Sequence, residues 1–142
     1  MKKIPALVFV TFVVLFGIAG NCKKGGGGGG GGGGTTEANL AITLNPPANS
    51  LQAPALGPNF PLTVTITSTM PPQGVTINVS AKIDGSTAAP FYTSGDLVSS
   101  TSLNNFSITG TPAATTALVT VVVTSRTKAT NTYTGTYRYA RK

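Results

Sequence analysis

The sequence predicts an all-β protein, an antiparallel two-sheet sandwich of seven or eight short strands in residues 37–142. Apolar and polar residues alternate with a period of two in run after run, which puts one set inside and the other outside. Turn residues separate these runs at intervals of about 8–12 residues, as in sandwiches. Residues 35–142 include 22 threonines, and such β-branched side chains favour strands over helices.

Three strands are predicted in the first half of this region, at residues 40–44, 60–67 and 75–83. The middle run is the cleanest, because every second residue is Phe, Leu, Val or Ile and most residues between them are Thr. Several prolines in residues 46–61 predict an irregular edge before it. The Pro-Pro-Gln-Gly sequence within residues 70–74 then predicts a turn.

In the second half, Asp84 is a turn former ahead of Gly85, and residues 126–131 predict the last hairpin loop, with charge at its tip. The final run puts Tyr137 and Tyr139 on the core face. Stronger runs lie at residues 106–109, 119–124 and 133–139, and two weaker ones, at 91–92 and 97–98, predict short edge pieces.

The order of these runs and turns resembles the immunoglobulin-like domains of bacterial surface proteins, although the Cys…Trp…Cys signature is absent. The resemblance is one of architecture and implies a sandwich. An open barrel is the alternative.

Residues 1–21 have the character of a secretory signal peptide. Lys2 and Lys3 form a positive start, residues 4–18 are mostly apolar, and small residues follow. The apolar stretch is shorter than the roughly 20 residues of a membrane span, although an uncleaved N-terminal anchor is the alternative.

Cys22, alone at the end of this segment, resembles the lipobox cysteine of bacterial lipoproteins. The resemblance implies cleavage before Cys22, lipidation of its thiol and acylation of the new amine, so that several acyl chains anchor the protein stably. Asn21 stands where the family has Gly or Ala. Lys23 after the cysteine implies, by analogy with lipoprotein sorting, an outer-membrane protein of the cell envelope that faces the periplasm or the cell surface.

Ten glycines, at residues 25–34, make residues 22–36 a predicted flexible linker with an r.m.s. span of about 20 Å. A phosphate-binding loop is not predicted, because no strand precedes the run and no helix beginning with Lys-Ser/Thr follows it.

The composition disfavours catalysis and metal binding. The chain has no His, one Cys and three acidic residues, which removes the commonest proton shuttle and any cysteine-rich zinc site. Glu37, Asp84 and Asp96 are too scattered to predict a calcium site. We therefore expect a non-enzymatic protein with neither a metal nor another cofactor. Without Lys2 and Lys3 the formal charge of +7 falls to +5, and no nucleic-acid partner is expected.

The predicted binding residues lie in loops, where contacts with partners concentrate. Phe91 and Tyr92 are the candidate exposed aromatic anchors, and Arg126 and Lys128 are the candidate basic contacts. These features predict an envelope lipoprotein whose sandwich binds another envelope protein or a glycan. The alternative is a structural spacer or assembly module that pairs through its sheet edges. The oligomeric state stays open.

Overall fold

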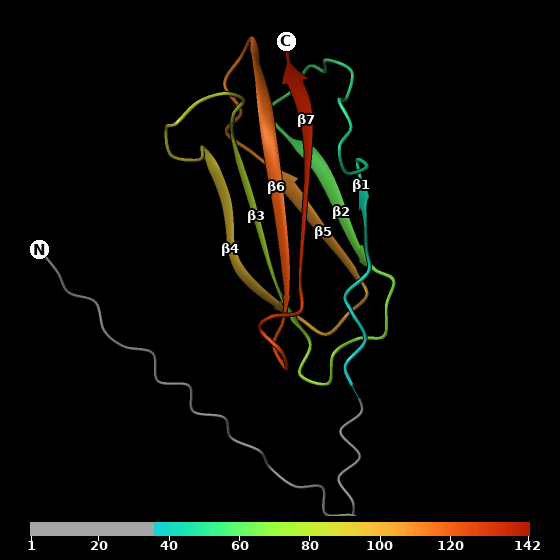
Figure 1. The fold of residues 1–142 in the computed structure, drawn as a ribbon. Helices are drawn as coiled ribbons and strands as arrows, with labels where there is room; N and C mark the ends of the chain where they lie inside the picture. The colour runs from blue at the N-terminus through green and yellow to red at the C-terminus, as the bar shows by residue number, and fades with distance from the viewer. Residues whose placement is uncertain (1–35) are drawn as a thin grey trace, which may run out of the picture. The chain divides into compact units, whose positions relative to one another are not determined.

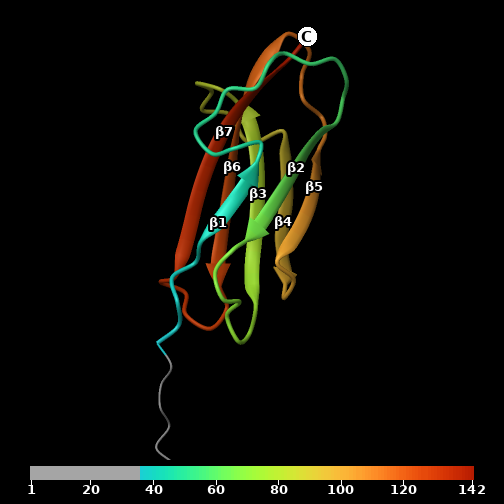
Figure 2. The ribbon, with the colours of Figure 1, turned by 90° about the vertical axis from the view of Figure 1, so that its right-hand side faces the viewer.

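The computed structural model describes residues 36–142. The predicted signal peptide, Cys22 and the glycine run therefore lie outside the described residues. Residues 36–142 form two antiparallel sheets packed face to face (Figures 1 and 2). The seven strands are β1 (Ile42–Asn45), β2 (Phe60–Ile66), β3 (Val75–Ile83), β4 (Tyr92–Ser99), β5 (Leu103–Ile108), β6 (Thr115–Ser125) and β7 (Thr132–Arg141).

The strand pairing confirms the predicted antiparallel two-sheet sandwich. One sheet has the order β1-β2-β5 and the other the order β4-β3-β6-β7, with antiparallel neighbours throughout. The chain crosses from one sheet to the other after β2, β4 and β5, and the inward faces of the two sheets share a single core.

The period-two alternation predicted the inward faces correctly. In β2, β3 and β6 every second side chain is buried between the sheets, and the intervening threonines are half-exposed. Burial of these apolar side chains is the main force holding the sheets together. The core consists of Leu44, Phe60, Leu62, Val64, Ile66, Val75, Ile77, Val79, Ala81, Ile108, Ala117, Val119, Val121, Val123, Tyr137 and Tyr139.

Two short edge pieces were predicted at residues 91–92 and 97–98; Tyr92, Leu97 and Val98 belong to one strand, β4, and Phe91 directly precedes it. This prediction missed the residues between them because a β-bulge interrupts the alternation. The register with β3 shifts at this point, and the backbone N–H of Val79 donates to Oγ of Ser94, 2.9 Å away. The result is a continuous but largely exposed edge strand.

The proline-containing segment between β1 and β2 covers the outer edge of β7. Leu51 and Ala55 form parallel bridges with Arg138 and Arg141. The Gln52 N–H donates to the Arg138 carbonyl, and the Arg138 N–H donates to the Ser50 carbonyl, at 2.8 and 2.9 Å. β7 is therefore not a free edge along this stretch.

The sandwich has two distinct ends. The proximal end contains the start of the described chain, residues 36–41, and the loops 67–74, 100–102 and 126–131. The distal end contains the segment 46–59 and the C-terminus, together with the loops that follow β3 and β5. In Figure 1 the proximal end is at the bottom.

Candidate functional site

A cavity of about 260 Å³ opens at the distal end, between the segment that covers β7, the start of β2 and the end of β7. Cavities of about 150 Å³ already accommodate a benzene ring, so this one has room for a ring or a branched side chain. Its lining residues are Pro46, Gln52, Ala53, Ala55, Phe60, Pro61, Tyr137 and Tyr139.

Two aromatic rings give the cavity a rigid wall. Phe60 of β2 and Tyr139 of β7 stack with their ring centroids 4.0 Å apart and an interplanar angle of 28°. The hydroxyl of Tyr139 shares a 2.6 Å hydrogen bond with the hydroxyl of Thr111. Thr111 is itself almost fully buried, so this bond satisfies two groups that have lost contact with water. The ring of Tyr139 is therefore held by its stacking on Phe60, and its hydroxyl is held by the bond to Thr111.

Tyr137 differs from Tyr139 in one respect. Its side chain is also almost fully buried, with 1% of the residue exposed, but its hydroxyl has no hydrogen-bond partner among residues 36–142. Burial raises the pKa of Tyr137 well above its usual value of 10.0, and the neighbouring Tyr139 and Tyr92 raise it further. The hydroxyl therefore stays protonated and keeps a hydrogen to donate.

The cavity is uncharged. None of its eight lining residues carries a charge. The nearby Arg138, which does not line the cavity, pairs with Asp84 at 2.7 Å, and Arg141 donates to the Thr111 carbonyl. Gln52 donates its side-chain N–H to Ser50 at 2.8 Å, which leaves its side-chain oxygen as an acceptor. The lining suits an apolar group with few polar contacts and contains no nucleophile with an adjacent base.

The backbone beside the cavity has an unpaired edge. Because Ser50 and Gln52 use their backbone groups on β7, the N–H and C=O of Leu51 point the opposite way, as the geometry of a parallel bridge requires. Neither Leu51 nor Ala53 makes a backbone hydrogen bond within the described chain. Leu51 is 70% exposed and Leu56 is 83% exposed, so this segment presents two large apolar side chains to solvent.

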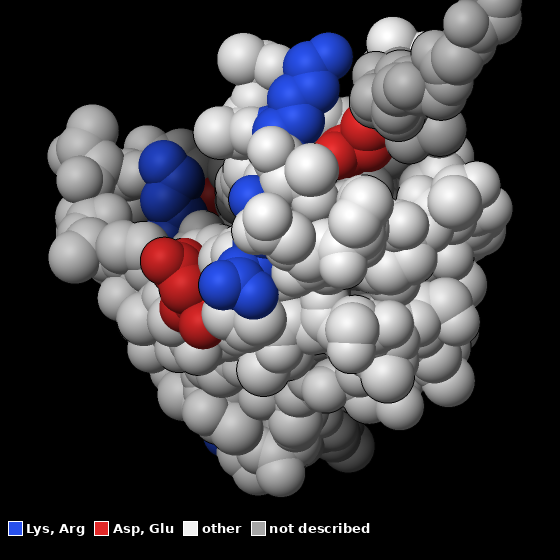
Figure 3. Space-filling view, turned by 90° about the horizontal axis from the view of Figure 1, so that it is seen from below, with Lys and Arg blue, Asp and Glu red and all other residues white. Residues whose placement is uncertain are grey.

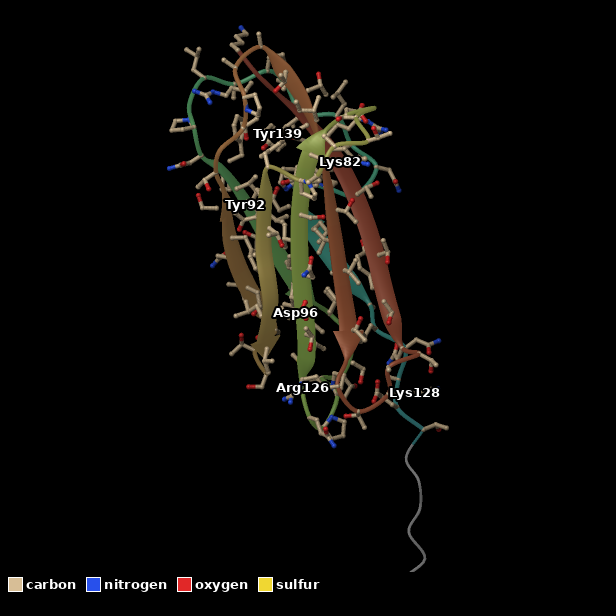
Figure 4. The ribbon with its side chains drawn as sticks, turned by 90° about the vertical axis from the view of Figure 1, so that its left-hand side faces the viewer. Lys82, Tyr92, Asp96, Arg126, Lys128 and Tyr139 are labelled. Carbon is tan, nitrogen blue, oxygen red and sulfur yellow. The ribbon has the colours of Figure 1, made fainter. Side chains whose placement is uncertain are left out.

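The predicted basic contacts lie at the other end of the molecule. Arg126 and Lys128 belong to the β6–β7 loop at the proximal end, as Figure 4 shows. This loop contacts the β2–β3 loop. The Arg126 N–H donates to the Gly74 carbonyl at 3.1 Å, and the Gln73 N–H donates to the Thr127 hydroxyl at 3.2 Å. The β2–β3 and β6–β7 loops therefore form one surface. Figure 3 shows this end with basic and acidic side chains interspersed among uncharged ones.

The predicted aromatic anchors lie near the distal end, far from Arg126 along the strands (Figure 4). Phe91 and Tyr92 are half-buried and pack against the core, contrary to the expectation that they are exposed. The Phe91 N–H also donates to the Ala81 carbonyl at 2.9 Å, which ties the start of β4 to β3. The structure thus does not combine the four predicted contacts into one site.

Sequence reasoning missed the cavity because its residues have structural explanations. Alternation assigned Tyr137 and Tyr139 to the core, and the Pro and Ala residues of the β1–β2 segment looked like an irregular edge. The one available signal was the placement of two tyrosines, which carry polar hydroxyls, on a buried face.

Within residues 36–142 no three His, Cys, Asp or Glu residues gather where they could hold a metal ion. That part of the chain also lacks a helix of sufficient length and hydrophobicity to cross a bilayer. No protein-family model matches the chain, and no curated protein matches its sequence.

Proposed function

We propose that this protein is a non-catalytic lipoprotein of the bacterial cell envelope, anchored through Cys22, whose sandwich binds a protein or glycan partner through the distal cavity. The observation that carries the proposal is the arrangement of the two ends. The described chain begins at the proximal end, whereas the cavity lies at the distal end. A lipid anchor attached through residues 22–36 leaves the cavity at the end remote from its attachment point.

Hydrogen bonds hold the start of the described chain against the proximal end of the sandwich. The Asn131 side chain accepts from the Leu40 N–H at 2.9 Å and donates to the Ala38 carbonyl at 2.9 Å and to Glu37. Asn131 is only 8% exposed, so these bonds are shielded from water. The predicted linker therefore joins the sandwich at a fixed point, Thr36.

The anchor is tested by Cys22→Ala and fractionation of the cells. We expect the variant to leave the membrane fraction, because a lipidated cysteine supplies the anchoring acyl chains. A variant that still sediments with membranes would refute the lipid anchor. Wild-type protein labelled with a radioactive fatty acid provides the positive control.

The binding role is tested by photo-crosslinking in intact cells. A photoreactive amino acid at Ala53, on the rim of the cavity, is compared with the same amino acid at Thr127, in the proximal loop. Both positions are exposed. We expect a discrete crosslinked partner from position 53 and not from position 127. Equal adducts from both positions, or none from position 53, would contradict the proposed site.

One observation favours a second function, assembly through the edge of β4. β4 ends its sheet and pairs only with β3 in the described chain. Leu97, Val98 and Leu103 around it are 41%, 56% and 56% exposed, a feature that often marks an interaction surface. If this edge drives assembly, sedimentation velocity will show concentration-dependent association that Val98→Lys abolishes. A monomer at all concentrations would exclude this function.

A further inference from the structure

We propose that a second copy of this chain pairs with the edge of β4, antiparallel to it and related by a two-fold axis that passes between the Leu97 residues of the two copies. This inference rests on the second function proposed above, assembly through β4. It names the partner and the register of the pairing.

The hydrogen bonds of β3 show which backbone groups of β4 are free. β3 lies between β4 and β6 (Figure 1), so successive residues of β3 turn their N–H and C=O groups to the two neighbours in alternation. On the β4 side, the Val79 N–H donates to the Ser94 hydroxyl and the Ala81 carbonyl accepts from the Phe91 N–H, each at 2.9 Å. The odd-numbered residues of β3 therefore bond β4.

The register then assigns the groups on β4 itself. Leu97 lies opposite Ile77 and Ser99 lies opposite Val75, so these two β4 residues use their backbone groups on β3. Residues 96 and 98 alternate with them and turn their N–H and C=O groups away from the sheet. No other strand of the described chain pairs with this side of β4.

One register lets a second copy satisfy all of these groups. With Leu97 opposite Leu97, Asp96 of each copy lies opposite Val98 of the other, and the two residues exchange both backbone bonds. A slip of two residues one way sets Asp96 opposite Asp96, with like charges. A slip the other way sets Asp96 opposite Ser100, which lies beyond the end of β4. A slip of one residue would place inward-facing residues opposite outward-facing ones.

The side chains fit the same register. The Leu97 side chain is 41% exposed, and in this pairing it meets its own copy across a non-hydrogen-bonded pair, where side chains approach most closely. Two apolar groups thereby leave water. The bulge at Ser94 and the left-handed Gly95, at φ 66°, end regular pairing on one side, and the end of β4 at Ser99 ends it on the other.

The other edge of this sheet does not compete along much of its length. Backbone bonds from the segment 46–59 cover β7 at Thr136, Arg138 and Ala140. Pairing of β4 with β4 is isologous, so it closes after two copies instead of extending into a filament.

The test is disulfide formation by the full-length chain in detergent, with Cys22→Ala so that each variant has a single thiol. Leu97→Cys places two sulfur atoms across a pair whose Cα atoms lie about 4.5 Å apart, within the range of a disulfide. Val98→Cys is the matched control, because its Cα atoms lie diagonally about 7–8 Å apart. We expect the Leu97→Cys dimer to form about tenfold faster on mild oxidation, although Val98 is the more exposed residue at 56%.

A second pair of variants needs no cysteine at the edge. Val98→Pro removes a free N–H, and proline is tolerated on the open side of an edge strand. Val98→Thr keeps the N–H and nearly the same shape. In sedimentation velocity we expect Val98→Pro to weaken association about fivefold or more, because each dimer loses two backbone bonds, and Val98→Thr to weaken it less.

The charge of Asp96 supplies a further readout. Its carboxylate accepts from the Asn78 side chain at 3.0 Å, and in the dimer the two Asp96 side chains lie diagonally on one face. At low salt, Asp96→Asn should therefore strengthen association about twofold. Added salt should strengthen the wild-type dimer and leave the variant nearly unchanged.

The outcomes separate the register from the assembly function. Val98→Cys dimers that form as fast as Leu97→Cys dimers, or equal association of Val98→Pro and Val98→Thr, would overturn the inference. If the chain associates in sedimentation velocity but neither cysteine variant crosslinks, the register is wrong and assembly stands. If the chain sediments as a monomer at all concentrations, both are wrong.

Discussion

The substitution Tyr137→Phe removes one buried oxygen atom and tests whether the hydroxyl lacks a partner. An unsatisfied polar group in a protein interior costs about 1–3 kcal/mol, and Tyr137 is 1% exposed with no partner for its hydroxyl in the described chain. We therefore expect Tyr137→Phe to raise the free energy of unfolding by about 1 kcal/mol. For a domain of this size that increase corresponds to a rise in Tm of roughly 4–8 °C.

The same change at Tyr139 provides the matched control, with the opposite sign. Tyr139→Phe breaks the 2.6 Å bond to Thr111 and leaves the Thr111 hydroxyl buried without a partner. We expect a loss of about 1–3 kcal/mol. Thr111→Val in the Tyr139→Phe background should recover part of that loss, because both partners are then apolar.

The assay is urea unfolding of residues 36–142, followed by circular dichroism, with thermal melts as the second measurement. The m-values of wild type and variants should agree, so that shifts in the midpoint report stability alone. If Tyr137→Phe destabilises the domain as much as Tyr139→Phe does, the hydroxyl of Tyr137 has a partner, such as a water molecule in the cavity, and the reasoning is refuted.

Three further predictions concern stability. The free energy of unfolding should fall as pH rises above about 10, because the unfolded chain then loses the Tyr137 proton while burial raises the pKa of Tyr137 in the folded state. Alkaline titration of Tyr137→Phe should show a smaller fall in the free energy of unfolding. An equal fall would contradict this origin. Gly74→Ala should destabilise the domain by more than about 1 kcal/mol, because φ is 75° and a Cβ would collide with the Ser99 carbonyl oxygen. Gly85 also has φ 75° but has open space around it, so Gly85→Ala should cost less in the same urea assay. Asn131→Ala should release the start of the chain at a cost of about 1–3 kcal/mol, visible as faster hydrogen exchange of the Leu40 amide; unchanged exchange would show that other contacts hold it.

The fold was predictable because its signals are local. Alternation in residues 60–66 and 75–83 depends only on the opposite directions of successive side chains in a strand, and the structure has strands at these positions. β4 was harder to predict because a bulge at Ser94 breaks the alternation and most of its side chains are exposed. An edge strand with little burial leaves a weak pattern in the sequence.

The candidate site was much less predictable. The cavity requires the segment 46–59 to fold back over β7, and that contact joins residues far apart along the chain, such as Leu51 and Arg138. No spacing within the sequence specifies such a contact. Phe91 and Tyr92 illustrate the converse, since aromatic residues in a predicted loop suggested exposed anchors but the start of β4 packs them against the core.

The sequence by itself therefore determined the all-β class, most strand positions and the inward faces, because these follow from local periodicity and turn chemistry. It also predicts a signal peptide and lipidation of Cys22, from linear motifs in residues 1–24. Only the tertiary structure decided that two tyrosines of the core line a cavity, that one hydroxyl is satisfied and the other is not, and that the cavity lies at the end away from the start of the domain. Those features depend on how the segment 46–59 and the two sheets meet in space.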